Sequence, residues 1–209
     1  MVKIILLDVD ETLYPKGTGP FTEVNRRIDR YVMASCKIDL DAARRLRNNY
    51  IESYGSTLQG LMHHYGIDPG NYLKDVHDVP VEELLHRDKK LHETLEALAC
   101  RLVAFTNGSL DYARRILKVL DIDDVIHDLF TIEYMDFVPK PLPWAYHKVI
   151  QQYGGCSQDY LVVDDSLANA RTARKVGMAA VLIGVSDPEG ILLSVPDIYE
   201  IPSLVSDAF

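Results

Sequence analysis

Acidic residues follow two short apolar segments of the chain. The segment IILLDVDETLYP passes from four aliphatic residues directly into Asp8 and Asp10, and a second segment, YLVVDD, ends in Asp164 and Asp165. Two carboxylates about 4 Å apart repel each other by roughly 4 kcal/mol at an effective dielectric constant near 20. If both segments end at the same place in the fold, these carboxylates must shift their pKa values or bind a cation.

Mg²⁺ is the cation that suits such a cluster. This hard ion prefers a few carboxylate oxygens together with water and the oxygens of a substrate phosphate. The four aspartates therefore predict a magnesium site that accepts a small phosphorylated molecule.

Four more residues have the chemistry to handle a phosphate. Thr106 and the backbone amides of Asn107 and Gly108 follow a third apolar segment, at a predicted strand-to-helix turn where N–H groups bind anions. Lys140 is flanked by prolines in VPKPLPW, and its ammonium group could hold a nucleophilic carboxylate and a phosphate together. A carboxylate nucleophile, a second acid, a hydroxyl, a lysine and metal-binding acids together describe phosphoryl transfer through an aspartyl-phosphate.

The apolar segments that carry these residues are typical of buried β-strands. They lack strict alternation of apolar and polar residues, which is the pattern of strands covered on both faces of a parallel sheet. Four such segments are clear and a fifth is weaker: 3–8, 102–107, 160–165, 179–184 and, last, 129–134.

Helical patterns separate these segments. They occur at 109–120, with Ser109 as the expected N-cap, at 141–155 and at 166–177. The alternation predicts an α/β fold with a doubly wound, Rossmann-like parallel sheet, whose ligands bind at the carboxyl ends of the strands.

One region departs from this alternation. The first strand is followed by a long stretch without any strand pattern, in which 22–36 and 39–55 place apolar side chains along one face of a helix. We therefore predict a helical cap domain at 15–88, inserted into a catalytic core that is formed by 1–14 and 89–209.

The composition limits the class of protein. With 209 residues, 47% of them apolar, and a net charge of −9, the chain favours a packed globular fold without a broad surface for nucleic acid or an anionic membrane. Cys36, Cys100 and Cys156 are odd in number and share no metal-binding spacing, which indicates free thiols in a reducing compartment. No signal peptide or membrane span is recognisable, so we expect a cytoplasmic protein whose partner is a small phosphate ester.

Four ordered motifs carry a resemblance to a known family. DVDETLYP, FTNGS, the KP pair at 140–141 and VVDDS resemble the motifs of the haloacid dehalogenase (HAD) superfamily of phosphohydrolases, and the match runs over nearly the whole chain. Within that superfamily, DETLYP, YGSTLQGL and FTNGSLDYARRILKVLDIDDVIHDLF are similar to the pyrimidine 5′-nucleotidase branch, which has a helical cap after the first motif.

The resemblance implies a role for each catalytic position. Asp8 would be the nucleophile that attacks phosphorus, and one of its oxygens would bind Mg²⁺. Asp10 would protonate the leaving oxygen and later deprotonate the hydrolytic water, while its backbone carbonyl contacts the metal. Thr106 would bind phosphate oxygens, helped by the Asn107 amide, and Lys140 would stabilise Asp8 and the transferring group.

The resemblance also implies the rest of the metal site. Asp165 would bind the metal directly, with Asp164 in support. Many relatives carry another acid a few residues further on, where this sequence has Asn169.

Other interpretations of the same residues stay open at this point. Asp8 and Asp10 could cap the turn after a strand, because aspartate favours turns. Within the superfamily, the alternatives are a sugar-phosphate phosphatase, a phosphomutase and a haloacid dehalogenase, although dehalogenation needs no leaving-group acid at Asp10. Outside the enzymes, a phospho-accepting regulatory module uses similar residues, but there the acid pair ends the first strand and the acceptor comes later. A catalytically silent phosphate-binding protein is the remaining alternative.

The cap contributes candidates for substrate contact. Aromatic and methionine side chains at helical spacing are usually core residues, yet several here could line a pocket for a nucleoside or a sugar. The candidates are Tyr50, Tyr54, Gln59, Met62, His63 and His64.

Overall fold

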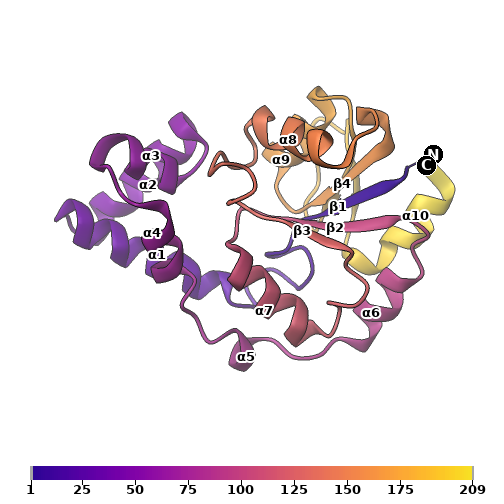
Figure 1. Ribbon diagram of the computed structural model, residues 1–209, viewed down its shortest axis with the longest axis horizontal. Coiled ribbons are helices and arrows are strands. Elements are labelled where there is room, and N and C mark those ends of the chain that lie inside the picture. The colour runs from indigo at the N-terminus through magenta and orange to yellow at the C-terminus, as the bar shows by residue number, and fades with distance from the viewer. Residues whose placement is uncertain (1, 209) are drawn as a thin grey trace.

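A six-stranded parallel sheet forms the centre of the molecule. The computed structural model describes residues 2–208, with side chains described as far as residue 206. The strands lie in the order β3-β2-β1-β4-β5-β6, so β1 is interior and the chain winds outward from it in both directions (Figure 1). Their bounds are β1 Ile4–Leu7, β2 Arg101–Phe105, β3 Asp128–Phe130, β4 Tyr160–Asp164, β5 Ala179–Ile183 and β6 Leu193–Val195. The predicted doubly wound, Rossmann-like α/β fold is confirmed.

Helices cover both faces of this sheet. Figure 1 shows α8 (Pro143–Tyr153) and α9 (Leu167–Lys175) on one face and α6 (Lys89–Glu96), α7 (Leu110–Leu120) and α10 (Ile201–Ala208) on the other. Successive residues of a strand point to opposite faces, and on β1 all of them are buried by this arrangement. Ile5 and Leu7 belong to the core on one side, and Ile4 and Leu6 to the core on the other. This explains why the strand segments are apolar without interruption.

Two strands at the edges of the sheet differ from the prediction. The weak segment at 129–134 becomes a strand only as far as Phe130, because the chain then turns through Asp136 and Phe137, which both have positive φ. The strand β6 was not predicted, since its three residues are exposed or half-buried and carry no continuous apolar signal.

Four helices form a lobe beside the sheet, between β1 and α5 (Val81–Leu84). They are α1 (Phe21–Cys36), α2 (Leu40–Tyr54), α3 (Thr57–Tyr65) and α4 (Pro69–Val76), and they lie together at one end of the molecule in Figure 1. We call α1–α4 the helical lobe. The division into a cap at 15–88 and a core at 1–14 and 89–209 stays a prediction.

Short polar side chains set where the helices of the lobe begin. Asp39, Ser56 and Asp68 each accept a hydrogen bond from the backbone N–H three residues further on, at 2.8, 3.1 and 2.8 Å. By contrast, Ser109 occupies the N-cap position of α7 but its side chain makes no capping hydrogen bond. The Leu110 N–H instead donates to Glu133, which contributes a carboxylate to the start of this helix.

Among residues 2–208, no helix combines the length and the apolar character that crossing a lipid bilayer requires.

The register of the sheet brings three strand ends to the same level. Leu7 of β1 pairs with Ala104 of β2 and with Val163 of β4. The next residues along these strands, which include Asp8 and Asp164, therefore lie at one edge of the sheet. This is the edge where ligands bind in doubly wound folds.

The interior position of β1 makes it sensitive to truncation. We expect Leu6→Ala, at a fully buried site on β1, to lower the free energy of unfolding by about 2–5 kcal/mol, since it leaves a cavity in close-packed surroundings. Leu193→Ala on the edge strand β6 is the matched control, because 46% of Leu193 is exposed and its loss should change stability by only about 0.5 kcal/mol. Urea denaturation measures both values, and equal effects would contradict the burial of β1.

Candidate active site

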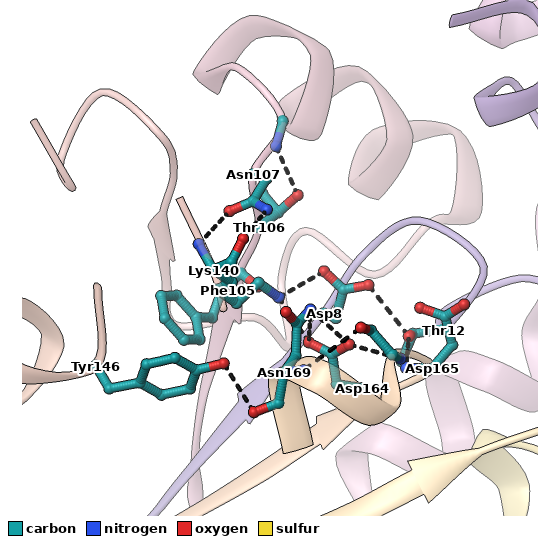
Figure 2. Close-up of polar contacts among 12 residues, drawn as sticks. Asp8, Thr12, Phe105, Thr106, Asn107, Lys140, Tyr146, Asp164, Asp165 and Asn169 are labelled. Carbon is teal, nitrogen blue, oxygen red and sulfur yellow. Dashed lines mark hydrogen bonds and ion pairs between the residues drawn. The ribbon is translucent and has the colours of Figure 1, made fainter. Parts of the chain in front are cut away.

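Carboxylates from β1 and β4 meet at the carboxyl edge of the sheet. Oxygens of Asp8, Asp164 and Asp165 all lie within 4.8 Å of one another. Figure 2 shows the three side chains together near Lys140. Asp164 is fully buried and Asp8 is only 8% exposed, whereas Asp165 is half-buried. Three carboxylates this close carry more negative charge than the surrounding side chains neutralise, so the cluster has the donor set of a hard cation.

Lys140 supplies the buried positive charge of the site. Its Nζ donates to Asp8 Oδ1 at 2.8 Å, to Asp164 Oδ2 at 2.8 Å and to the carbonyl oxygen of Phe105 at 2.6 Å. These three acceptors match the three protons of an ammonium group. Burial lowers the pKa of Lys140, but the charges of Asp164 and Asp8 outweigh it and raise the pKa above the ordinary value. Lys140 is therefore a cation at neutral pH.

The Asn107 side chain fixes the backbone of Lys140. Its Oδ1 accepts from the Lys140 N–H at 2.8 Å, and its Nδ2 donates to the Lys140 carbonyl at 2.9 Å. Sequence analysis assigned Asn107 only a backbone contact to phosphate and missed this pair of bonds. The amide side chain ties the end of β2 to the loop that carries the lysine.

The two adjacent acids after β4 have different surroundings. Asp164 accepts from Lys140, from the Ser166 N–H at 2.9 Å and from Asn169 Nδ2 at 2.9 and 3.0 Å, so its oxygens are occupied by protein donors. Among the described residues, the Asp165 carboxylate pairs only with the exposed Lys16 ammonium, at 3.5 Å. Asp164 thus holds Lys140 in place, while Asp165 has an oxygen free for another ligand. Asn169 serves here as a donor to Asp164.

Thr12 is a site residue that sequence analysis missed. Its hydroxyl donates to Asp8 Oδ2 at 3.2 Å and accepts from the Asp165 N–H at 3.2 Å. A tight turn brings it there, because the Leu13 N–H bonds the Val9 carbonyl at 3.1 Å. Thr12 therefore connects the acid of β1 to the acids that follow β4. The only sequence signal was its position four residues after Asp8.

The turn after β2 has the form of an anion site. The Gly108 N–H donates to Thr106 Oγ at 2.9 Å, and Thr106 is buried just before the N-terminus of α7. A Cβ atom at residue 108 would come within 3.0 Å of the Tyr112 ring and 3.2 Å of Thr106 Oγ, so only glycine fits there without a shift. The hydroxyl of Thr106 and the helix N-terminus both favour an anion at this end of the cavity.

Asp10 stands apart from the acid cluster and contacts two tyrosines. The Tyr112 hydroxyl donates to its Oδ1 at 2.7 Å, and the Tyr14 hydroxyl donates to the same oxygen in a shorter contact. Burial raises the pKa of Asp10 to about 6, although both phenol hydrogen bonds act in the opposite direction. A carboxyl group with this pKa exchanges a proton readily at neutral pH.

Burial also raises the pKa of Asp8, to about 8, with a further contribution from the negative charge of Asp164 and an opposing one from Lys140. One ammonium group cannot fully stabilise two buried carboxylates beside it. The site therefore holds a proton in place of the missing positive charge whenever no other cation supplies that charge.

A cavity of about 650 Å³ opens over these residues, between the sheet edge and the helical lobe. Its polar end contains Asp8, Asp10, Thr106, Lys140 and Asp165. The wall from the lobe mixes apolar and polar side chains. The apolar ones include Phe21, Val24, Ile28, Tyr72, Leu73 and Val76, and the polar ones are Asn25, Arg47, Glu52, Ser56 and Thr57.

The six lobe residues singled out from the sequence do not line this cavity, and their interpretation as its lining is wrong. Three of them are engaged in contacts within the protein instead. The Tyr54 hydroxyl pairs with His64 Nε2 at 2.8 Å, and the Gln59 side chain donates to the Phe137 carbonyl. Tyr50 is buried against Gly60. The lining comes instead from α1, the other side of α2, the start of α3, and α4. Helical spacing alone does not say which face meets the sheet edge.

A family profile described as a haloacid dehalogenase-like hydrolase matches residues 2–177. The chain belongs to this hydrolase family. The expected HAD membership is confirmed, and the match includes Asp8, Lys140 and the paired acids after β4.

Individual relatives agree with the fold. "Phosphate metabolism protein 8" of Saccharomyces cerevisiae is 28% identical over an alignment of 202 residues. The alignment covers 88% of this chain and only 62% of that protein's length. A HAD phosphatase from Thermococcus onnurineus is 22% identical over 98% of both chains, with a TM-score of 0.64. L-2-haloacid dehalogenase from Xanthobacter autotrophicus is 15% identical over the whole of both chains, also with a TM-score of 0.64. Phosphatases and dehalogenases share this fold, so the fold alone does not choose between them.

The raised pKa of Asp8 makes stability depend on pH when divalent cations are removed. Between the ordinary value of 3.8 and about 8, the folded state keeps a proton on Asp8 that the unfolded state releases, so the free energy of unfolding falls as pH rises. We expect wild type in EDTA to lose stability relative to Asp8→Asn from about pH 5 to about pH 8, by up to ~1.4 kcal/mol per pH unit.

Urea titrations at several pH values measure this difference between the two proteins, in which the contributions of other titrating groups largely cancel. A difference that stays constant, or that changes in favour of wild type as pH rises, would contradict the raised pKa.

Proposed function

We propose that this hydrolase is a Mg²⁺-dependent phosphomonoesterase that acts through an aspartyl-phosphate on Asp8. The observation that carries the proposal is the Lys140 ammonium group bonded to Asp8 and Asp164 at 2.8 Å each, with a second acid, Asp10, lining the same cavity. This arrangement supplies a nucleophile, a fixed cation and a proton donor to one small substrate.

In the proposed reaction, a carboxylate oxygen of Asp8 attacks the phosphorus atom of the ester. The bond from phosphorus to the leaving oxygen breaks, and Asp10 gives that oxygen its proton. A water molecule, deprotonated by Asp10, then attacks the phosphorus atom and restores Asp8 with release of phosphate. Lys140 and Thr106 stabilise the charge on the phosphoryl oxygens in both steps.

The donor set fits Mg²⁺. Asp8 and Asp165 have carboxylate oxygens within 4.8 Å of each other, and the cluster carries three carboxylates against one buried lysine. We propose that Asp8 and Asp165 bind the metal, with the Asp10 carbonyl as a third ligand, and that Asp164 supports them through Lys140 and Asn169. The ion supplies positive charge that lets Asp8 ionise and that stabilises the transferring phosphoryl group.

Dehalogenation is disfavoured by the second acid. A halide leaves as a stable anion and needs no proton, whereas an alkoxide leaving from phosphorus does. Asp10 lines the cavity and has a pKa near neutrality, as a proton donor for such a leaving group requires. Release of chloride from 2-chloropropionate at rates above those for phosphate esters would reverse this preference.

For the substrate, we propose a nucleoside 5′-monophosphate, with a pyrimidine base as the first choice. The lobe wall of the cavity offers Phe21 and Tyr72 to a planar ring. Asn25 and Arg47 lie in the same wall and are bonded to each other, with Arg47 Nη2 donating to Asn25 Oδ1 at 2.7 Å. Arg47 Nε is buried and has no hydrogen-bond partner among the described residues. The similarity of the DETLYP and YGSTLQGL segments to pyrimidine 5′-nucleotidases supports the same choice.

Phosphate release from p-nitrophenyl phosphate tests the reaction. We expect turnover that EDTA abolishes and excess Mg²⁺ restores, and a loss of at least about a thousandfold in Asp8→Asn, because that variant lacks the nucleophile. Asp123→Asn, the same substitution at an exposed residue, is the control and should keep full activity. Normal turnover in Asp8→Asn, or turnover unaffected by EDTA, would refute the proposal.

A matched pair of substrates tests the base. Uridine 5′-monophosphate and ribose 5-phosphate share the phosphate and the sugar, so only the base differs. We expect kcat/KM to be at least about tenfold higher for the nucleotide, which corresponds to ~1.4 kcal/mol from the base in the apolar wall. A preference for ribose 5-phosphate or another sugar phosphate would show a sugar-phosphate phosphatase, and an isomeric sugar phosphate as product would show a phosphomutase.

A further inference from the structure

The carboxylate of Asp10 is anchored through one of its two oxygens. Both tyrosine hydroxyls, of Tyr14 and Tyr112, donate to Oδ1. No side chain among the described residues donates to Oδ2, and Asp10 is one of the residues that line the cavity. One oxygen is thus held by the protein, and the other is left for substrate or water.

Each of the two phenol rings is fixed by a chain segment that links the helical lobe to the sheet. On the way into the lobe, Gly19 packs so closely on the Tyr14 ring that a Cβ atom at Gly19 would overlap it. On the way back, His77 stacks on Tyr112, with ring centres 4.5 Å apart and an interplanar angle of 14°. His77 immediately follows α4 and lines the cavity, whereas Tyr112 lies on α7 beneath the sheet (Figure 1).

The stack on Tyr112 does not involve a charged histidine at neutral pH. Burial lowers the pKa of His77 to about 4, so its ring is neutral. Both tyrosines are also buried, at 5% and 1% exposure, which restricts their rings to the observed orientations. The two hydroxyls are therefore fixed points for the carboxylate between them.

We propose that Tyr14 and Tyr112 are positioning residues that hold Asp10 so that its Oδ2 delivers and receives the proton at the leaving oxygen. The proposal rests on the proposed function, in which Asp10 is the proton donor. The same two contacts make the placement of Asp10 depend on both connections to the helical lobe, through Gly19 on one side and His77 on the other.

The step that depends on this placement is the breaking of the ester bond. As the Asp8 oxygen bonds to phosphorus, the electron pair of the old P–O bond moves to the leaving oxygen, which takes the proton from Asp10 Oδ2. Asp10 becomes a carboxylate whose Oδ1 keeps both phenol hydrogen bonds. An alkoxide leaving group needs this proton, but 2,4-dinitrophenolate leaves without it.

The test compares two esters within each protein variant. Tyr112→Phe and Tyr14→Phe each remove one hydroxyl while leaving the ring in place. For uridine 5′-monophosphate we expect kcat/KM to fall roughly ten- to a hundredfold, because part of the contribution of the general acid is lost. For 2,4-dinitrophenyl phosphate we expect kcat/KM to fall by less than about threefold, because its leaving group needs no proton. The ratio of the two values is independent of the amount of folded enzyme, and kcat/KM reports the first chemical step for both esters.

Two controls accompany these variants. Asp10→Asn should show the same selective loss in a more extreme form. Tyr160→Phe removes a hydroxyl of a fully buried tyrosine that donates to the Gly154 carbonyl at 2.6 Å, at the opposite end of β4, and should change neither ester selectively.

Equal losses on both esters in Tyr14→Phe and Tyr112→Phe, with a selective loss in Asp10→Asn, would overturn the positioning role alone. If Asp10→Asn also lost kcat/KM equally on the two esters, the positioning role and the proposed role of Asp10 would fail together. The same holds if wild type released phosphate from neither ester.

Discussion

The structure of the site depends on one buried ammonium group among an excess of buried carboxylates. Lys140 is almost fully buried, and its three bonds to Asp8, Asp164 and the Phe105 carbonyl occupy all three protons of its ammonium group. Removing charges from water is costly, and a buried pair is tolerated only when the geometry is good and every proton has an acceptor. The three bonds meet this condition for the lysine. They do not meet it for the acids, which remain short of positive charge.

That shortage determines the arrangement of the surrounding residues. Asp164 is surrounded by donors from Ser166 and Asn169, so its charge is stabilised by the protein. Asp8 and Asp165 are joined through Thr12 and have fewer donors, so they are the acids that gain from an additional cation. The fold thereby gives Asp164 a structural role and leaves Asp8 and Asp165 suited to metal binding. Asp164 and Asp165 differ in this way although they are neighbours in the sequence.

The sequence predicted the parts of the site that sit on the strands themselves. The uninterrupted apolar segments indicate strands buried on both faces, and parallel strands place the residues after them at a common edge, so the proximity of Asp8 and Asp164 follows from local patterns. The Asn107 clamp on Lys140 and the Tyr112 contact to Asp10 join residues 33 and 102 positions apart, through loops whose paths have no periodic signal. For the same reason the lining of the cavity was predicted on the wrong side chains of the lobe. Which face of α2 turns toward the sheet depends on the connections of the lobe, and these are irregular.

The cavity has two walls with separate origins in the chain. The charged end is built on strand ends that the sheet register fixes, whereas the other wall comes from the helical lobe, which takes no part in the sheet. Substitutions at Val24, Ile28 or Tyr72 are expected to alter the shape of the wall without changing the strand ends that carry Asp8 and Asp164. The choice of molecule that fits the cavity can therefore change through the lobe separately from the charged residues at the strand ends.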